Sequence, residues 1–158
     1  MNKQALIKRL QDIEWEDFEV KEAHSEIPRN IWETVSAFSN TSGGWIVLGV
    51  KQVGKKYELI GVNHPEKVEQ DFTNTLRSEK FNRKIVPICK NYIIGDKKIL
   101  AFYIPLAEIK PVYYNTPTNT YIRTASGDQR ATQAETDSMF RNAPFGNKDK
   151  ELTSLTIK

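Results

Sequence analysis

Residues 36–50 have the sequence SAFSNTSGGWIVLGV, and this stretch decides the fold of the chain. Its first half is typical of the end of a buried helix, and its second half of a strand that is apolar on both faces. Gly43 and Gly44 lie between the halves, where glycine permits a positive φ and lets another backbone approach closely. The stretch therefore predicts a helix–turn–strand corner, with Asn40, Gly43 and Gly44 at the turn. Such a corner either only turns the chain or presents backbone N–H groups to a ligand.

Apolar periodicity and helix-start signals predict four helices. The third is the clearest, because Pro65 opens it and Val68, Phe72 and Leu76 form one apolar stripe. The other three are expected over residues 2–13, from about Pro28 to Asn40, and from the capping-box residues Thr132 and Glu135 to about Asn142.

Strand-like runs fill the remaining chain, at residues 18–21, 45–50, 57–62, 85–89, 92–94, 99–104, 110–114 and 120–123. Residues 45–50 are expected to pair with 57–62 as a hairpin, and 110–114 with 120–123. These elements predict an α+β fold, a mainly antiparallel or mixed sheet with about four packed helices. Residues 1–146 should form one domain, and the polar, aperiodic residues 147–158 a linker or tail toward a further domain.

The composition excludes several classes of protein. The chain has 158 residues, 39% of them apolar, and a formal net charge of +3. No stretch reaches the roughly 20 apolar residues of a membrane span, and the N-terminus lacks the apolar core of a signal peptide. With Cys89 as the single cysteine and only two histidines, neither a disulfide nor a Cys/His zinc cluster is expected. We therefore expect a cytoplasmic protein without a membrane partner and without a cofactor in this domain.

Two groups of basic residues are candidate phosphate contacts. Bases outnumber acids between residues 77 and 98, a stretch that contains Arg83 and Lys84 and that either binds phosphates or is an ordinary solvated sheet edge. Arg123 and Ser126 follow each other around the turn after residues 120–123, with Lys110 on the preceding strand. A guanidinium, a hydroxyl and free backbone amides in one turn are suited to a phosphate. The alternative is a polar loop that only leads to the last helix.

A pair of carboxylates is the candidate for catalysis. Glu14 and Glu19 lie close to the first predicted strand, where two carboxylates can share a divalent cation or act as acid and base. Metal-dependent cleavage of a phosphodiester usually needs a third carboxylate. The alternative is a pair of ordinary surface acids.

Four blocks of the chain together resemble the Schlafen AlbA-like domain, a family generally assigned to DNA binding. They are EWEDFEVK at residues 14–21, SAFSNTSGG at 36–44 followed by LGV at 48–50, KPVYY at 110–114, and TYIRTAS at 120–126 followed by Ala131 and Thr132. The resemblance covers roughly residues 12–142, and the second block is the most specific.

The resemblance implies an α+β fold related to Alba chromatin proteins. In bacteria and archaea it implies the N-terminal part of a transcriptional regulator or of a RecG-related ATP-dependent helicase, in which a separate downstream domain binds ATP. Vertebrate Schlafen proteins cleave structured RNA at three carboxylates, and Glu14 and Glu19 match the first two. Gln52 matches the third, and a neutral amide is a poor ligand for a metal ion.

We therefore expect a nucleic-acid-binding regulatory module, with DNA favoured over RNA, that contacts phosphates through Arg123, Ser126, Lys110, Arg83 and Lys84. One alternative is a metal-dependent nuclease that uses Glu14 and Glu19. Another is a protein-interaction module, and the paired domains of the wider family make a homodimer an expectation.

Overall fold

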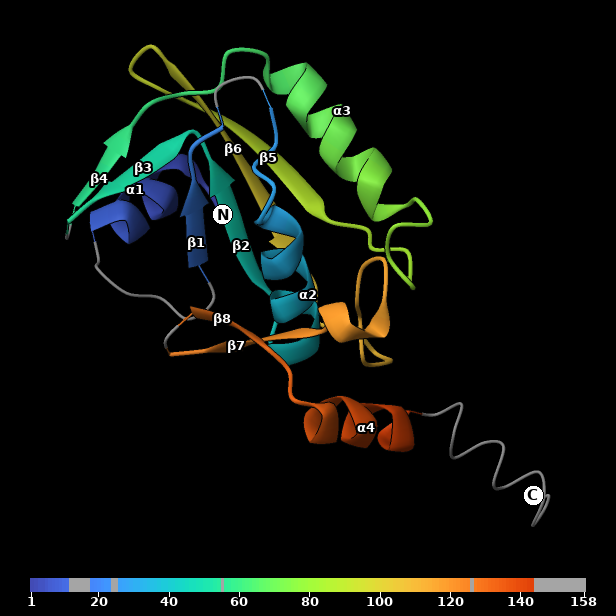
Figure 1. The fold of residues 1–158 in the computed structure, drawn as a ribbon. Coiled ribbons are helices and arrows are strands. Elements are labelled where there is room, and N and C mark those ends of the chain that lie inside the picture. The colour runs from blue at the N-terminus through green and yellow to red at the C-terminus, as the bar shows by residue number, and fades with distance from the viewer. Residues whose placement is uncertain (12–17, 24–25, 55, 126, 144–158) are drawn as a thin grey trace.

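The computed structural model describes residues 1–11, 18–23, 26–54, 56–125 and 127–143 (Figure 1). The predicted tail at 147–158 and the predicted site residues Glu14 and Ser126 lie outside these ranges. The elements are, in chain order, α1 (Lys3–Gln11), β1 (Phe18–Lys21), α2 (Ile31–Thr41), β2 (Gly44–Leu48), β3 (Val50–Val53), β4 (Lys56–Leu59), α3 (Pro65–Leu76), β5 (Ile88–Ile94), β6 (Lys97–Ile104), the 3-10 turn η1 (Pro117–Asn119), β7 (Tyr121–Thr124), β8 (Gly127–Arg130) and α4 (Gln133–Asn142).

A four-stranded sheet forms the centre of the fold, in the order β1-β2-β6-β5 (Figure 1). β1 is parallel to β2, whereas β6 is antiparallel to both of its neighbours. The helices α2 and α3 cover one face of this sheet, and α1 with the β3–β4 hairpin covers the other. The predicted α+β fold, with a mixed sheet and four helices, is confirmed.

The central strand β2 is buried on both faces, as its apolar run predicts. Ile46 and Leu48 point into the core under α2 and α3, whereas Val47 points into the core under α1. All three side chains are fully buried. Because each buried aliphatic side chain contributes about 1.5–3 kcal/mol through removal of apolar surface from water, this strand holds the two layers together.

The helix α3 uses the predicted apolar stripe. Val68, Phe72 and Leu76 are all fully buried in the first core. The ring of Phe72 lies 4.2 Å from that of Phe102 on β6 and 5.7 Å from that of Trp32 on α2. One side chain therefore joins α3 to both the sheet and α2.

Gly43 makes the corner between α2 and β2. Its φ is +74°, and its N–H donates to the carbonyl oxygen of Phe38 at 2.8 Å. A Cβ at this position would lie 2.9 Å from the carbonyl oxygen of Ile104, so the close approach requires glycine. Gly44 is already the first residue of β2, in register with Ile104. The corner turns the chain, and the N–H of Gly43 is engaged within the fold.

The predicted hairpin between residues 45–50 and 57–62 is wrong in its first strand. Gly49, with φ +98°, ends β2 and turns the chain into β3. The hairpin is therefore β3 with β4, a separate two-stranded sheet, while β2 pairs with β1 and β6. A glycine inside an apolar run produced this break, which apolar periodicity does not detect.

The second half of the chain differs from the predicted strands in two places. The runs at 85–89 and 92–94 are one strand, β5, which starts at Ile88. Residues 110–114 and 120–123 meet only at an isolated bridge between Tyr113 and Thr120, and β7 instead pairs with β8. The sequence of β8, GDQR, lacks apolar alternation and was therefore expected to be a loop.

The last helix begins as predicted but does not pack on the sheet. Thr132 and Glu135 form the expected capping box at the start of α4. Thr136 is the buried residue of this helix, which lies beside the loops of the lower part of the molecule (Figure 1). In the described part of the chain, no helix has the length and apolarity needed to cross a membrane.

Candidate functional site

The polar face of α2 docks two distant segments of the chain. The Asn40 side-chain amide donates to the carbonyl oxygens of Val112 and Tyr121, each at 2.9 Å, and its Oδ1 accepts from the N–H of Val112 at 2.7 Å. The Ser36 hydroxyl donates to the carbonyl oxygen of Val112 at 2.7 Å and accepts from the N–H of Tyr121 at 3.0 Å. These bonds occupy Asn40 and Ser36 inside the fold, so the most specific sequence block has a structural role.

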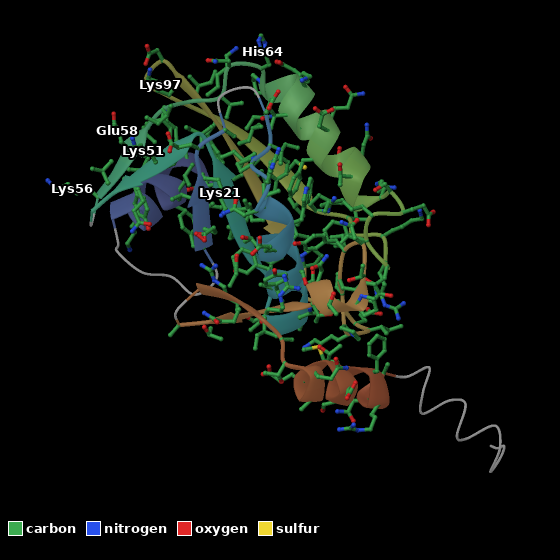
Figure 2. All side chains as sticks on the ribbon, in the orientation of Figure 1. Lys21, Lys51, Lys56, Glu58, His64 and Lys97 are labelled. Carbon is green, nitrogen blue, oxygen red and sulfur yellow. The ribbon has the colours of Figure 1, made fainter. Side chains whose placement is uncertain are left out.

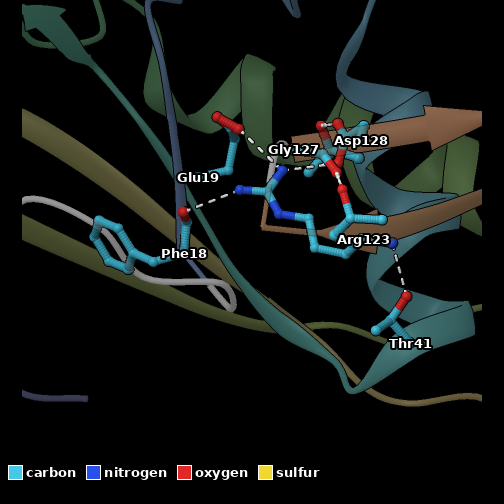
Figure 3. Close-up of polar contacts among 8 residues, drawn as sticks. Phe18, Glu19, Thr41, Arg123, Gly127 and Asp128 are labelled. Carbon is cyan, nitrogen blue, oxygen red and sulfur yellow. Dashed lines mark hydrogen bonds and ion pairs between the residues drawn. The ribbon is translucent and has the colours of Figure 1, made fainter.

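Arg123 on β7 lies at the centre of a charged network (Figure 3). Its NH1 lies 2.8 Å from Oδ1 of Asp128 on β8 and 3.3 Å from Oε2 of Glu19 on β1. The Thr34 hydroxyl on α2 donates to the other oxygen of Asp128 at 2.5 Å. The guanidinium also lies 5.1 Å from the centre of the Phe38 ring, so the network joins β1, α2, β7 and β8.

The Arg123 charge is compensated within this network. Its side chain is only 10% exposed. Burial alone lowers the pKa of Arg123, but the hydrogen bond and charge of Asp128 and the charge of Glu19 outweigh it, so the pKa is raised. A phosphate would have to compete with two carboxylates for this guanidinium. The geometry therefore favours a structural role over the predicted phosphate contact, and Ser126, its expected companion, lies outside the described residues.

The other predicted cations lie elsewhere in the fold. Lys110 lines a hollow beside α4, and Arg83 and Lys84 line a neighbouring pocket. Glu108 lines both cavities, and Arg123 lines neither of them. The Lys84 ammonium donates to the carbonyl oxygen of Arg77 at 2.8 Å, just after the end of α3.

The described residues of the nuclease alternative do not fit a divalent cation. The Glu19 carboxylate accepts from Arg123, and the Gln52 amide on β3 donates to the carbonyl oxygen of Gly54 at 3.4 Å. Glu14 lies outside the described ranges. Within those ranges, no three His, Cys, Asp or Glu side chains gather as a metal site would require.

The structure places four lysines from distant parts of the sequence on one side of the molecule, and we call Lys21, Lys51, Lys56 and Lys97 the lysine edge (Figure 2). The N–H of Gly49 donates to the carbonyl oxygen of Lys21 at 2.9 Å, and the carbonyl oxygen of Gly49 accepts from the N–H of Gly61 at 2.8 Å. The stem of Lys97 lies against Gly61, because a Cβ there would be 3.4 Å from its Cδ. The ends of β1, β2 and β4 and the start of β6 therefore meet at this edge.

The charges of the lysine edge are weakly compensated. None of the four lysines forms an ion pair with another described residue, and Lys51 and Lys56 are exposed. Glu58 stands opposite Lys51 in the hairpin register (Figure 2), and Glu22 and Asp96 are the sequence neighbours of Lys21 and Lys97. The sequence did not predict this group, because its members are far apart in the chain, at positions 21, 51, 56 and 97. The one local signal was the alternation of Lys51 and Val53 along β3, which places both on one face of the hairpin.

Two solved structures resemble the chain in fold. The first is the N-terminal domain of a protein from Nitrosomonas europaea described as related to the ATP-dependent DNA helicase RecG, with a TM-score of 0.63 and 28% identity over 81% of this chain and 92% of that chain. The second is the DIP2311 protein of Corynebacterium diphtheriae, with a TM-score of 0.56 and 14% identity over 89% of this chain and 32% of that chain, which shows the fold alone.

The family is shown by the sequence itself. No curated protein matches the chain. The family model described as Schlafen, AlbA_2 matches residues 14–132, which include the polar face of α2, the Arg123 network and the lysine edge. This chain therefore belongs to the Schlafen AlbA_2 family.

Proposed function

We propose that the domain binds nucleic acid, with DNA favoured over RNA, through phosphate contacts of the lysine edge, and that it serves as a regulatory module of a larger protein. The observation that carries this proposal is that four lysines, from β1, β3, β4 and β6, lie on one side of the molecule (Figure 2). None of them has an ion-pair partner among the described residues. The name of the Nitrosomonas europaea protein, which describes it as related to the DNA helicase RecG, supports DNA over RNA.

The chemistry of the lysine edge suits a nucleic-acid backbone. An ammonium on a flexible stem acts as a point charge toward phosphate and does not discriminate between bases. The four lysines lie on strands, one each on β1, β3, β4 and β6, whereas a recognition helix presents its base contacts from a helix. Binding should therefore depend on salt and vary little with sequence.

A binding assay on matched variants tests this function. Lys51→Gln/Lys97→Gln removes two charges from the lysine edge, and we expect it to weaken binding of a labelled 20-base-pair duplex by about tenfold or more in fluorescence anisotropy. Two duplexes of unrelated sequence should be weakened equally. The control, Lys67→Gln/Lys90→Gln, removes two exposed lysines of α3 and β5 and should change affinity by less than about threefold. Equal losses in the two double variants would contradict the proposal.

A further inference from the structure

A pocket separate from the lysine edge lies between the segment after α3 and the segment after β6. Its volume is about 310 Å³, and α2 contributes Ser39 to its lining. Lys97 begins β6 and Pro105, which lines the pocket, follows the end of that strand. At about 3.3 Å per residue, Lys97 and Pro105 are about 26 Å apart along the direction of β6. The pocket is therefore not an extension of the lysine edge.

Two buried polar atoms in this pocket lack hydrogen-bond partners. They are the Ser39 hydroxyl oxygen and the Arg83 Nε, and among the described residues these are the buried side-chain nitrogen and oxygen atoms left without a partner. Ser39 is 1% exposed, and both residues line the pocket. A buried polar group without a partner costs about 1–3 kcal/mol, so a ligand that supplies a partner for either atom would be favoured here.

Comparison with the preceding turn of α2 makes the Ser39 hydroxyl distinctive. The Ser36 hydroxyl, also fully buried, donates to Val112 and accepts from Tyr121. The backbone carbonyl of Ser39 accepts from the N–H of Ala107, while its hydroxyl stays unused. The fold satisfies one serine of the helix completely and leaves the other at the wall of a cavity.

The pocket lining indicates an organic anion. Arg83 and Lys84 supply positive charge, and the Ser39 hydroxyl supplies a further donor. Ile85, Ile109 and Val112 supply apolar wall, against which a ring or a chain would pack. Glu108 also lines the pocket and is an acceptor suited to an amino or hydroxyl group. A volume near 300 Å³ lies at the lower end of ligand pockets and suits a molecule of the size of a mononucleotide.

We propose that this pocket binds a small organic phosphate of mononucleotide size, with the phosphate held by Arg83, Lys84 and the Ser39 hydroxyl and the body packed on the apolar wall. The Lys84 ammonium has three donors and uses one on Arg77, so it retains capacity for the phosphate. The site stands independently of nucleic-acid binding at the lysine edge.

Calorimetric titration with adenosine 5′-monophosphate tests the pocket. We expect saturable binding with one site per chain, weakened about tenfold or more by Arg83→Gln and about threefold or more by Ser39→Ala. Adenosine without its phosphate and inorganic phosphate without the nucleoside should each bind at least about tenfold more weakly than the monophosphate. The control variant is Ser138→Ala, which lies in the neighbouring hollow beside Lys110 and should bind as the unchanged protein does.

Three outcomes would overturn the proposal: no saturation up to about 10 mM monophosphate, equal binding of adenosine and the monophosphate, or unchanged binding in both pocket variants. Ser39→Ala removes an unpaired hydroxyl and should fold as well as the original, which circular dichroism checks, so the result does not depend on the arginine variant alone. The variant Lys51→Gln/Lys97→Gln should retain monophosphate binding. Loss of duplex binding and loss of monophosphate binding thus report on different sites.

Discussion

Asn40 and Val112 hold each other by two reciprocal hydrogen bonds although 72 residues separate them. The Asn40 amide nitrogen donates to the Val112 carbonyl at 2.9 Å, and the Asn40 carbonyl oxygen accepts from the Val112 N–H at 2.7 Å. An asparagine is thus used as a substitute for a peptide group of a neighbouring strand. The same amide also donates to Tyr121, so one side chain satisfies three buried backbone groups.

Replacing this side chain should destabilise the domain strongly. Asn40→Ala removes the hydrogen bonds that this side chain makes to the Val112 N–H, the Val112 carbonyl and the Tyr121 carbonyl. Because these backbone groups are buried, we expect a loss of about 3 kcal/mol or more in the free energy of unfolding. Urea denaturation followed by circular dichroism measures it. The control is Asn74→Ala on the exposed face of α3, which should stay within about 0.5 kcal/mol. A loss for Asn40→Ala no larger than that of the control would show that the hydrogen bonds do not stabilise the fold.

Substitutions at Gly43 and Gly54 distinguish two reasons why a glycine stabilises the fold. One reason is a positive φ, and the other is the close approach of a neighbouring backbone. Both have positive φ, +74° and +60°. A Cβ at Gly43 would lie 2.9 Å from the Ile104 carbonyl oxygen, whereas a Cβ at Gly54 would have no neighbouring atom within 4 Å. We expect Gly54→Ala to cost about 1 kcal/mol and Gly43→Ala at least about 2 kcal/mol more in thermal or urea unfolding. Equal losses would mean that the backbone around Gly43 yields easily.

Removing Arg123 should leave two partly buried carboxylates without a counter-ion. The Asp128 side chain is 15% exposed and that of Glu19 is 26% exposed, so we expect Arg123→Met to lose about 2 kcal/mol, less than for a fully buried pair. Because the already high pKa of Arg123 is raised further, its charge is complete at both pH 7 and pH 9, and the loss should be the same at the two pH values. Arg141→Met, at an exposed position on α4, is the control for urea unfolding. A stability loss in the control as large as that of Arg123→Met would contradict this account.

Cys89 should react slowly in the folded protein. Burial and, to a smaller extent, the charge of Glu69 raise the pKa of its thiol from 9.0 to about 11. At pH 8 the thiolate fraction, and with it the rate of alkylation by iodoacetamide, should be about 100-fold lower in the folded than in the urea-unfolded chain. The preference of the fold for the neutral thiol is complete below pH 9 and is lost as the pH rises through about 11.

The variant Glu69→Gln provides the control for this reaction. Removing the smaller of the two causes should speed alkylation of the folded chain modestly and leave the rate in urea unchanged. Equal rates for the folded and unfolded chains would show that the thiol is not protected by burial.

The salt dependence of duplex binding should count the phosphate contacts of the lysine edge. The logarithm of the association constant falls with the logarithm of salt concentration by about 0.9 per neutralised phosphate. Lys51→Gln/Lys97→Gln should therefore reduce this slope by about 2. Anisotropy titrations between about 50 and about 200 mM salt measure it. A slope unchanged from that of the original protein would place the phosphate contacts elsewhere.

The sequence predicted the elements that carry a clear local pattern. The α3 stripe, the α4 capping box and the β2 strand were read from local patterns, since helical spacing, capping residues and a continuous apolar run each leave a local signature. The β8 strand was missed, because Asp128, Gln129 and Arg130 have no such signature and pair only with β7.

The candidate sites were harder to predict, because their chemistry depends on pairs distant in the sequence. Arg123 was expected to be available for a phosphate, but one of its carboxylate partners, Glu19, lies 104 residues away. The lysine edge was not expected at all, since Lys21 and Lys97 are joined through Gly49 and Gly61 only in the folded chain. Lys110 was expected beside Arg123, but it lines a hollow next to α4, and Arg83 and Lys84 line the neighbouring pocket.

Val112 and Tyr121 are bonded to side chains of the helix α2 and not to the edge of a strand. This arrangement restricts the register in which their segments can pack against the helix. A strand edge repeats its donors and acceptors every two residues and therefore accepts slipped alignments. Ser36 and Asn40 offer their groups only once, so a shift by two residues would leave most of these bonds unmade. The bonds of Ser36 and Asn40 to Tyr121, the first residue of β7, therefore fix where that strand begins along α2.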